Sequence, residues 1–330
     1  MKRLRIIGTG SCLPDRVVEN HEVAGPLGMS AGQIERLTGI RERRWAVDGQ
    51  ATSDLAIGAS RLALESAGCE ASAVDAVILS TTSSDMAFPS TACFVQRGLG
   101  CRGVGAFDVS ASCSGFLYGL SMADAMIRSG QAATCLVIAA EVKSRFLDPA
   151  DAATAALFGD GAGAVLVRGE EDHSPNGRGL LGIRLYADGA KHDLIRVPAG
   201  GSRRPASAET VANHEHVLRM RGASLFRIAV RRVEQAVQEI LKEFGVRIED
   251  VGQVVLHQAN GRILSRIAER LGVPPERLTS VIDRYGNTSS ASLPIALDAA
   301  VRGGRIAAGD LVLLGSFGGG LTWATGLMRW

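Results

Sequence analysis

The sequence has almost no excess of charge of either sign. Its 36 Lys and Arg residues nearly balance its 34 Asp and Glu residues, and the formal net charge is +2. A nucleic-acid-binding domain usually carries a clustered basic excess, so this balance argues against a nucleic-acid partner. The sequence also has no run of about 18 apolar residues, the length that a membrane-crossing helix needs. We therefore predict neither a nucleic-acid partner nor a membrane span.

Cysteine is sparse and scattered. The six cysteines form no Cys-x-x-Cys pair and lie at residues 12, 69, 93, 101, 113 and 135. This spacing excludes the usual zinc and dithiol motifs. Residues 1–7 lack the apolar stretch and the cleavage site of a signal peptide. We therefore expect a cytoplasmic protein with no disulfides and no metal site.

Two stretches near the N-terminus lack the features of a ligand site. Residues 8–14 are rich in turn formers, but they lack the third glycine and the following helix of a dinucleotide-binding fingerprint. Residues 38–44 form a short basic segment, which by composition is typical of a solvated surface loop. We expect a turn at the first stretch and an exposed loop at the second.

Glycine and apolar residues are abundant. The chain contains 40 glycines, and 46% of its residues are hydrophobic, as is typical of an α/β protein with many tight turns. Helical and strand-like periodicities alternate along the sequence. We expect helices at residues 52–67, 89–99, 224–244, 262–271 and 294–302, and strands at residues 5–8, 74–80, 104–109, 133–140, 164–167, 251–256, 281–283, 311–314 and 321–330.

The two halves of the chain repeat the same order of elements. Asp75 and Asp250 each precede a strand, and the elements that follow them are equally spaced. In that register Cys113 corresponds to Thr288. A polar loop around residues 170–182 is the natural boundary. We predict two pseudo-symmetric βαβ-rich halves, residues 1–170 and 171–330.

Cys113 lies where a predicted strand turns into a predicted helix. The first amides of a helix have no intrahelical partner and the helix dipole is positive there, so both favour a thiolate. The neighbours of Cys113 are serine, alanine and glycine, which leave space around the sulfur. A nucleophile and a small buried core residue are both compatible with this position. For a nucleophile, we expect the helix start to lower the pKa of the thiol.

His257 and Asn287 also follow predicted strands. Taken singly, the histidine is compatible with a structural role, and the Gly-Asn pair at residues 286–287 is a common turn. Ligand sites in such sheets lie at the carboxyl ends of strands. We therefore expect Cys113, His257 and Asn287 to meet in one pocket, where a thiolate beside an imidazole suits acyl transfer.

Two classes of enzyme use cysteine, histidine and asparagine in this chain order. One is the papain-like protease, but its Cys-Gly-x-Cys-aromatic signature is absent. The other is the thioester-condensing enzyme, in which histidine and asparagine donate hydrogen bonds to a thioester oxygen. The second class fits the sequence better.

Motifs spread over nearly the whole chain carry a family resemblance: Thr38-Gly-Ile-Arg41, Phe88-Pro-Ser90, Ala111-Ser-Cys-Ser-Gly-Phe116, Phe158-Gly-Asp-Gly-Ala-Gly163, His257-Gln-Ala-Asn-x-Arg-Ile263, Tyr285-Gly-Asn-Thr-Ser-Ser-Ala291 and Phe317-Gly-Gly-Gly-Leu-Thr-Trp323. With these motifs the chain resembles β-ketoacyl-acyl-carrier-protein synthase III, in the thiolase-like superfamily. The resemblance implies a layered α-β-α-β-α architecture and a homodimer.

The resemblance also implies an activity. Cys113, His257 and Asn287 would be the catalytic triad, and the backbone amides of Cys113 and Gly319 would form the oxyanion hole. Cys113 would take an acyl group from a thioester. The acyl-enzyme would then condense with malonyl-acyl carrier protein in fatty acid biosynthesis. This chemistry implies no metal and no redox cofactor, with acyl-coenzyme A or acyl carrier protein as substrates.

Further family positions concern the acyl pocket and docking. Phe317 and Phe88 match acyl-pocket residues, and Phe88 would reach the pocket of the partner subunit. Three basic residues match positions that dock acyl carrier protein, although by composition they are equally typical of solvated helix faces: Arg227, Arg262 and Arg270. The resemblance thus implies acyl carrier protein as a partner.

The chain departs from the family where coenzyme A would bind. Gln33 and Leu37 replace the tryptophan and arginine that usually hold the adenine, and Ala152 replaces a further arginine. We therefore expect a primer bound to carrier protein, or coenzyme A in an altered pose. Two other functions stay open on this scaffold: an acyltransferase or ketosynthase of a specialised polyketide or secondary-metabolite pathway, and a catalytically silent subunit, against which the retained triad argues.

Overall fold

Ten of the described strands form two mixed sheets of five strands each, and the other four form two-stranded sheets. The computed structural model describes residues 2–171 and 177–330. The first sheet has the order β1-β7-β6-β4-β5, and the second has the order β12-β11-β13-β14-β8. The strands of the first sheet are β1 Lys2–Cys12, β4 Ala76–Ser80, β5 Gly105–Val109, β6 Thr134–Glu141 and β7 Gly161–Glu171. Those of the second are β8 Gly179–Ala187, β11 Gln253–Leu256, β12 Leu278–Thr279, β13 Leu311–Gly318 and β14 Thr322–Arg329.

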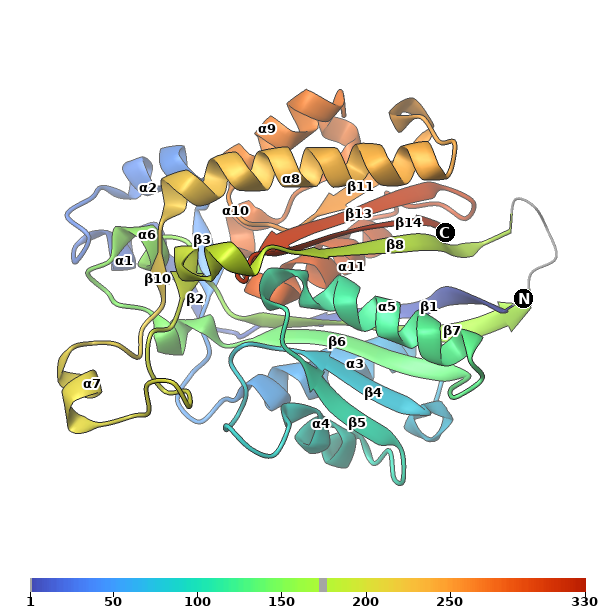
Figure 1. Ribbon diagram of the computed structural model, residues 1–330, viewed down its shortest axis with the longest axis horizontal. Helices are drawn as coiled ribbons and strands as arrows, with labels where there is room; N and C mark the ends of the chain where they lie inside the picture. The colour runs from blue at the N-terminus through green and yellow to red at the C-terminus, as the bar shows by residue number, and fades with distance from the viewer. Residues whose placement is uncertain (1, 172–176) are drawn as a thin grey trace.

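Helices cover both faces of each sheet, which gives the predicted α-β-α-β-α layers (Figure 1). The central strands β4, β6 and β11 are buried along their whole length, as expected for strands covered on both faces. The outer layer of the first sheet contains α3 Thr52–Ser66 and α4 Thr91–Leu99. The shared central layer contains α5 Gly115–Arg128 and α11 Ser292–Arg302. The outer layer of the second sheet contains α8 Gly222–Glu243 and α9 Gly261–Leu271.

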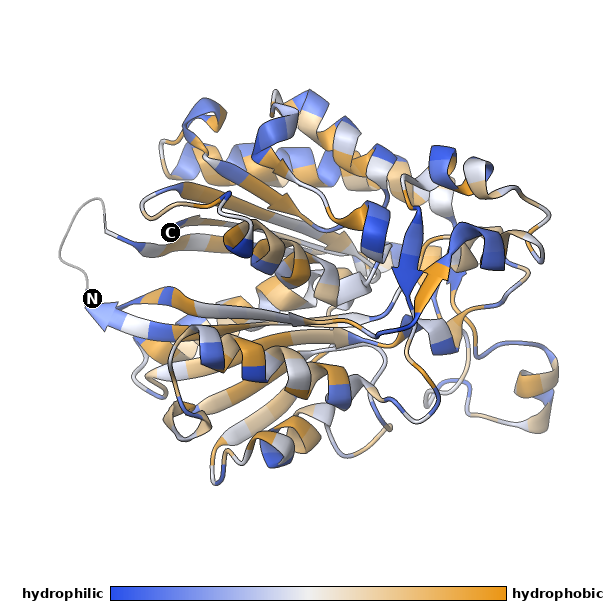
Figure 2. Cartoon of the chain, turned by 180° about the vertical axis from the view of Figure 1, so that it is seen from behind, coloured by the Kyte–Doolittle hydropathy of each residue, from blue (hydrophilic) through white to orange (hydrophobic). Residues whose placement is uncertain are grey.

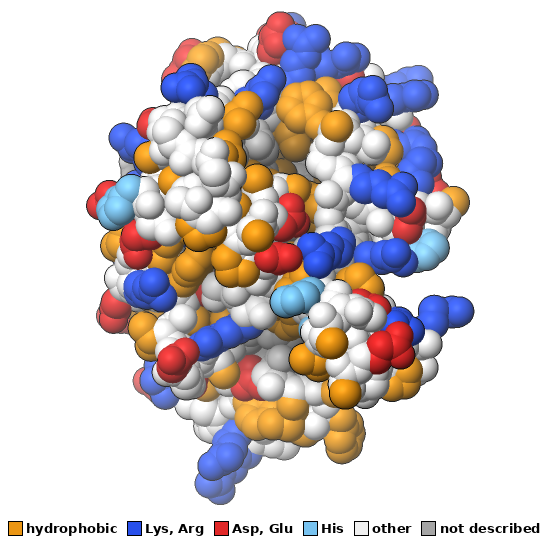
Figure 3. All heavy atoms as spheres, turned by 90° about the vertical axis from the view of Figure 1, so that its left-hand side faces the viewer, with side chains coloured by type: hydrophobic (Ala, Val, Ile, Leu, Met, Phe, Trp, Pro, Cys, Tyr) orange, Lys and Arg blue, Asp and Glu red, His pale blue; other side chains and the backbone are white. Residues whose placement is uncertain are grey.

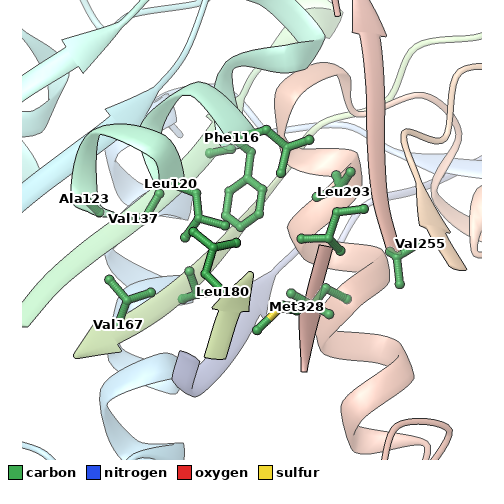
Figure 4. Packing of buried hydrophobic residues seen from close by; sticks show 14 of the residues in the cluster. Phe116, Leu120, Ala123, Val137, Val167, Leu180, Val255, Leu293 and Met328 are labelled. Atoms are coloured by element: carbon green, nitrogen blue, oxygen red, sulfur yellow. The ribbon is translucent and has the colours of Figure 1, made fainter. Parts of the chain in front are cut away.

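The main core lies where the central helices meet both sheets. Phe116 and Leu120 of α5, Leu293 of α11, Val137 of β6 and Met328 of β14 belong to one buried cluster (Figure 4). Separate clusters pack beneath α3 and α4 and beneath α8 and α9. Figure 2 shows apolar residues concentrated in the strands and hydrophilic residues recurring along the outer helices. The hydrophobic periodicity of the sequence therefore corresponds to real buried faces.

Shorter elements gather at the end of the molecule where the central strands finish. They are β2 Val17–Glu19, α1 Asn20–Ala24, α2 Ala31–Thr38, β3 Glu42–Arg44, α6 Ala152–Ala155, β9 Ile195–Arg196, α7 Ala208–Ala212, β10 Arg219–Met220 and α10 Ile282–Tyr285. The strand β2 pairs with β3, and β9 pairs with β10. Two single-turn 3₁₀ helices precede the central helices: η2 Ser112–Ser114 before α5, and η7 Ser289–Ala291 before α11.

The predicted repeat is present, but its register differs. Ala76 pairs with Cys135 as Gln253 pairs with Val312, so the equivalent of Gln253 is Ala76. The residues before the nucleophile turn and its counterpart, Ser112 and Ser289, have φ angles of 50° and 52°. Cys113 therefore corresponds to Ser290, and the predicted match to Thr288 is wrong. The Asp75 and Asp250 signal misled because the two aspartates occupy different places in the connections before the strands: Asp75 directly precedes β4, whereas Asp250 ends the 3₁₀ turn Ile248–Asp250, with two residues between it and β11.

The predicted strand at residues 281–283 is also wrong. These residues enter the short helix α10, and the strand of this region is the two-residue β12. Val281 and Ile282 are both buried, Val281 in the main core and Ile282 in the cluster beneath α8 and α9. Short apolar runs do not distinguish a strand from a turn of helix.

Most of the predicted turn at residues 8–14 is instead strand, because β1 continues to Cys12. Gly8 and Gly10 lie inside the strand against α3, and a Cβ on Gly8 would stand 2.2 Å from the carbonyl oxygen of Ala63. Glycine within a strand often marks such a close approach of two backbones. The glycines therefore serve packing here rather than a turn.

The predicted solvated loop at residues 38–44 is partly buried. Arg43 is fully buried in β3, and its guanidinium donates hydrogen bonds to Asn20 Oδ1 and to the Ala156 carbonyl, each at 2.9 Å. Burial lowers the pKa of Arg43 to about 10. Composition could not reveal this, because the acceptors come from segments far away in the sequence.

The boundary between the two halves touches residues that the structure does not describe. β7 ends at Glu171 and β8 begins at Gly179, and part of the predicted loop, residues 172–176, lies outside the described residues. The division at residues 170 and 171 stays a prediction. Within residues 2–171 and 177–330, no helix combines the length and apolar character needed to cross a membrane.

Candidate active site

The three predicted catalytic side chains line one cavity of about 650 Å³. Cys113 comes from η2, His257 follows β11, and Asn287 precedes η7. The strands β5 and β11 bring the first two residues to the same end of the molecule, as expected for parallel strands in repeated halves. All three are nearly buried, with exposed fractions of 5% or 6%. The cavity wall is otherwise largely apolar, which suits an acyl thioester.

Cys113 is held between two serine hydroxyls. Its Sγ lies 3.5 Å from Ser289 Oγ and 3.9 Å from Ser112 Oγ. Burial raises the pKa of the Cys113 thiol, and the hydrogen bond with Ser289 opposes this only in part. The expected lowering of the pKa by the helix start is therefore wrong, because desolvation of the sulfur dominates. The thiol must lose its proton during attack.

His257 is neutral and firmly oriented. Its Nδ1 lies 2.5 Å from Ser292 Oγ, which also accepts the backbone N–H of Gln258 at 3.1 Å. When the Ser292 hydroxyl donates to Nδ1, the imidazole proton resides on Nε2. Burial lowers the pKa of His257 to about 3. Near neutral pH the ring is therefore an uncharged hydrogen-bond donor.

The buried neutral imidazole predicts a pH-dependent stability. Its pKa is about 3 in the folded chain and about 6.5 when exposed. As pH falls below 6.5 the unfolded chain gains a proton that the native chain does not, so stability decreases. We expect His257 to account for a loss on the order of 3 kcal/mol between pH 7 and about pH 4. Urea unfolding of wild type and His257→Asn at each pH measures this difference. If the free energy of unfolding decreased equally in the two proteins between pH 7 and about pH 4, the prediction would be wrong.

Asn287 is fixed by two hydrogen bonds. Its Oδ1 accepts the Ser289 N–H at 2.9 Å, and its Nδ2 donates to the Ala259 carbonyl at 3.2 Å. An asparagine amide carries two N–H donors. One hydrogen of Nδ2 therefore remains for a substrate oxygen in the cavity that Asn287 lines.

A buried carboxylate that the sequence did not reveal supports the site. Glu141, fully buried, accepts hydrogen bonds from Ser289 and Ser290, at 3.1 and 2.9 Å, and lies 3.2 Å from Lys143. Burial favours a raised pKa, but Lys143 and the hydroxyl donors outweigh it and lower the pKa of Glu141. The one available signal was a charged residue ending an apolar strand. Glu141 holds the turn that places Ser289 against Cys113.

The two proposed oxyanion-hole residues lie next to each other. The position where Gly318 would carry a Cβ is 2.6 Å from the Cys113 backbone nitrogen, so the end of β13 packs directly on η2. The Gly319 N–H donates to Ser112 Oγ at 3.1 Å. Phe317, of the predicted acyl pocket, lines the cavity, whereas Phe88 is 86% exposed and lies outside the lining of this cavity.

The residues that depart from the coenzyme A pattern lie in different surroundings. Leu37 and Ala152 line the cavity, and neither offers a charge or a stacking ring. Gln33 has a local role instead, because its side chain accepts the Ser30 N–H at 2.7 Å and caps α2. The side chain of Gln33 is therefore engaged away from the cavity.

The predicted docking arginines are exposed on α8 and α9. Arg262 borders the cavity, and Arg270 pairs with Glu234 at 2.7 Å. Arg227 lies one residue beyond the cavity-lining Phe226. Figure 3 shows the face of the molecule on which α2 and the start of α8 lie, and basic side chains gather on the upper part of this face. This part of the surface is thus basic.

Comparison with known proteins gives a consistent result. Residues 107–189 match the family model "3-Oxoacyl-[acyl-carrier-protein (ACP)] synthase III", and residues 241–330 match the model of its C-terminal part. The chain is 47% identical over 330 residues to a β-ketoacyl-[acyl-carrier-protein] synthase III of Erythrobacter litoralis, with all of both chains covered. The corresponding protein of Xanthomonas campestris is 46% identical over 326 residues, covering 99% of this chain and 98% of the relative.

Solved structures agree with this assignment. The synthase III of Aquifex aeolicus superposes with a TM-score of 0.90 at 42% identity, covering 99% of this chain and 100% of the other. The priming β-ketosynthase of the R1128 polyketide pathway superposes with a TM-score of 0.90 at 34% identity, covering 99% and 96%. The predicted thiolase-like fold and condensing-enzyme class are confirmed, and the chain belongs to the β-ketoacyl-[acyl-carrier-protein] synthase III family of acyltransferases, the condensing enzymes that initiate fatty acid biosynthesis.

Proposed function

We propose that Cys113 is the nucleophile of a two-step condensation. In the first step Sγ bonds to the carbonyl carbon of an acyl thioester, and the carbon–sulfur bond to the carrier breaks. The carrier leaves as a thiol with the proton that Cys113 loses. The convergence of Cys113, His257 and Asn287 on one apolar cavity supports this proposal.

The second step uses malonyl-acyl carrier protein. The bond to the malonyl carboxylate breaks, CO₂ leaves, and the electron pair moves toward the thioester oxygen. Donors from neutral His257 and from Asn287 stabilise that oxygen, and one such donor can be worth about 3 kcal/mol. The carbanion then attacks the acyl-enzyme, and Cys113 is released as a thiol after protonation. Amides of Cys113 and Gly319 would hold the oxyanion formed in each acyl transfer.

The partners follow from the same proposal. Acyl carrier protein would dock on Arg227, Arg262 and Arg270, which are exposed on α8 and α9, and Arg262 borders the cavity. Such a basic surface suits an acidic partner. A second copy of the chain would cover Phe88, whose side chain is largely exposed. We place this activity in the cytoplasm, with primary fatty acid synthesis.

One observation favours a second candidate function. The priming ketosynthase of a polyketide pathway shares 34% identity and the whole fold with this chain. The same two steps could therefore start a specialised polyketide or secondary metabolite. The two functions differ in primer, which depends on the wall of the cavity rather than on the triad.

Intact-mass spectrometry tests the proposal. The protein is incubated with a panel of short, branched and long acyl groups on coenzyme A and on carrier protein, and release of CO₂ from malonyl-acyl carrier protein is followed separately. One acyl mass added at Cys113, together with decarboxylation, supports the condensation. Acylation without decarboxylation would instead indicate transfer to a different acceptor.

The lining of the cavity at Leu37 and Ala152 predicts a preference for a carrier-protein primer. Leu37 and Ala152 give coenzyme A no phosphate contact, and each charge-assisted contact is worth about 1.5–3 kcal/mol. We expect acylation of Cys113 from carrier protein to exceed that from coenzyme A by at least about tenfold, because 1.4 kcal/mol corresponds to that factor. Matched acyl groups on the two carriers provide the measurement.

A gain-of-contact variant is the control for this preference. Leu37→Arg combined with Ala152→Arg is expected to raise the coenzyme A rate and to leave the carrier-protein rate unchanged. These positions are chosen over Gln33 because Gln33 caps α2. A wild-type preference for coenzyme A with a micromolar constant would overturn the prediction.

A further inference from the structure

Ser112 connects the nucleophile to the proposed oxyanion hole. Its Oγ accepts the Gly319 N–H at 3.1 Å, and the same hydroxyl lies 3.9 Å from Cys113 Sγ. An oxygen at about 3 Å from an oxyanion-hole amide stands where a substrate oxygen is expected to bind. The chain itself therefore supplies an oxygen at this place.

The backbone at Ser112 is held while its side chain is able to turn. Thr322 Oγ1 donates to the Ala111 carbonyl at 2.8 Å, and Ser114 Oγ donates to the Thr322 carbonyl at 3.1 Å. These bonds fix η2 to the start of β14 on both sides of Ser112. The direction of the Ser112 hydroxyl depends on one side-chain torsion, χ1. Rotation about χ1 therefore breaks the hydrogen bond with the Gly319 N–H and frees this amide without moving Cys113.

Ser112 has a backbone conformation that residues with a side chain rarely adopt. Its φ of 50° lies in the left-handed region, where glycine is favoured and other residues are strained. The hydrogen bond to Gly319 offsets part of that strain. Its counterpart in the second half, Ser289, has the same backbone conformation and touches the other side of the sulfur, but bonds to Glu141 instead of an oxyanion-hole amide. The repeat thus places two hydroxyls at Cys113 with different second partners.

We propose that the Ser112 hydroxyl is a displaceable occupant of the oxyanion hole, which the thioester oxygen of the acyl donor must replace before Cys113 is acylated. This inference rests on the proposed function, because it needs Gly319 to bind the reacting oxygen. When Sγ bonds to the carbonyl carbon, the carbonyl electron pair moves onto oxygen and accepts the Gly319 N–H. Ser112 keeps its own proton throughout and rotates away, so it forms and breaks no covalent bond.

Displacement of the Ser112 hydroxyl from Gly319 adds to the barrier for acylation of Cys113 but not to the barrier for its alkylation. Alkylation of the thiolate by iodoacetamide forms a carbon–sulfur bond and expels iodide, and it develops no oxyanion. Removing the Ser112 hydroxyl should therefore assist acylation more than alkylation. One neutral hydrogen bond corresponds to a factor of about three to ten.

The test compares two rates on the same protein. Acylation of Cys113 by the best acyl donor and alkylation by iodoacetamide are both followed by intact mass over time. In Ser112→Gly, which suits the positive φ, the ratio of acylation to alkylation is expected to rise about three- to tenfold over wild type. Ser112→Ala, which keeps a Cβ, should raise the ratio in the same direction.

Ser289→Ala is the matched control. It removes a hydroxyl from the sulfur and leaves the contact between Ser112 and Gly319, so both rates are expected to change together and the ratio to stay near that of wild type. A ratio in both Ser112 variants that equals or falls below the wild-type ratio would overturn the inference. Wild-type protein that is alkylated normally but acylated by no thioester would instead disprove the proposed function, and this inference with it.

Discussion

Replacement of Cys113 by serine is expected to abolish the acyl-enzyme, with a loss of acylation rate greater than about a thousandfold. A serine hydroxyl is a weak nucleophile at its ordinary pKa and needs an adjacent general base. In this cavity the neighbouring imidazole binds Ser292 through Nδ1, and its pKa of about 3 makes it a poor proton acceptor. Intact-mass spectrometry after incubation with the best acyl donor measures the loss directly.

The other thiols provide the control for this experiment. Cys93 is the exposed cysteine, so it is the thiol most open to adventitious transfer. Cys93→Ser is expected to keep full acylation, and its peptide map should show the acyl group on Cys113. A stable adduct on any other cysteine in Cys113→Ser would refute the assignment of the nucleophile.

Sequence patterns predicted those parts of the fold that depend on local periodicity. The buried runs of β4, β6 and β11 and the amphipathic faces of α8 and α9 lie within a few residues of their expected bounds. Arg43 and Gly8 were misjudged because their environment is made by distant segments. The carbonyl of Ala156 satisfies Arg43, and the backbone of α3 excludes a side chain at Gly8. Neither contact could be predicted from the residues next to Arg43 or Gly8 in the sequence.

In the site, too, sequence patterns predicted some residues and missed those whose role depends on contacts between distant segments. Sequence reasoning brought Cys113, His257 and Asn287 together as polar or nucleophilic residues at strand ends. Cys113 and His257 do follow β5 and β11, but Asn287 follows the short helix α10, so its predicted place in the cavity was right although the predicted strand was wrong. Their supports are serines and one glutamate, which are common in any loop. Ser292 orients His257, and Glu141 holds Ser289 only because η7 folds back onto β6. The raised pKa of Cys113 also depends on burial, which the position at a helix start does not reveal.

Replacement of His257 by alanine is expected to remove malonyl decarboxylation and condensation by about 10²–10³-fold while acylation of Cys113 remains measurable. When Ser292 donates to Nδ1, the neutral ring carries its N–H at Nε2, and a donor of this kind stabilises charge on the malonyl thioester oxygen. Acylation depends instead on the thiol and on the amides at residues 113 and 319. Release of CO₂ from malonyl-acyl carrier protein and single-turnover acylation, measured on the same variant, separate the two steps.

Asn287→Ala and Ser292→Ala distinguish the donor from its support. Asn287→Ala removes the second donor and is expected to resemble His257→Ala, since the amide faces the same cavity. Ser292→Ala leaves both donors in place but removes the partner of His257 Nδ1. Decarboxylation should therefore fall less than in His257→Ala. Its pH profile should shift, because the imidazole proton is then free to reside on either ring nitrogen. If His257→Ala lost acylation and kept decarboxylation, the imidazole would act on the thiol instead, and the assignment of the two steps would have to be reversed.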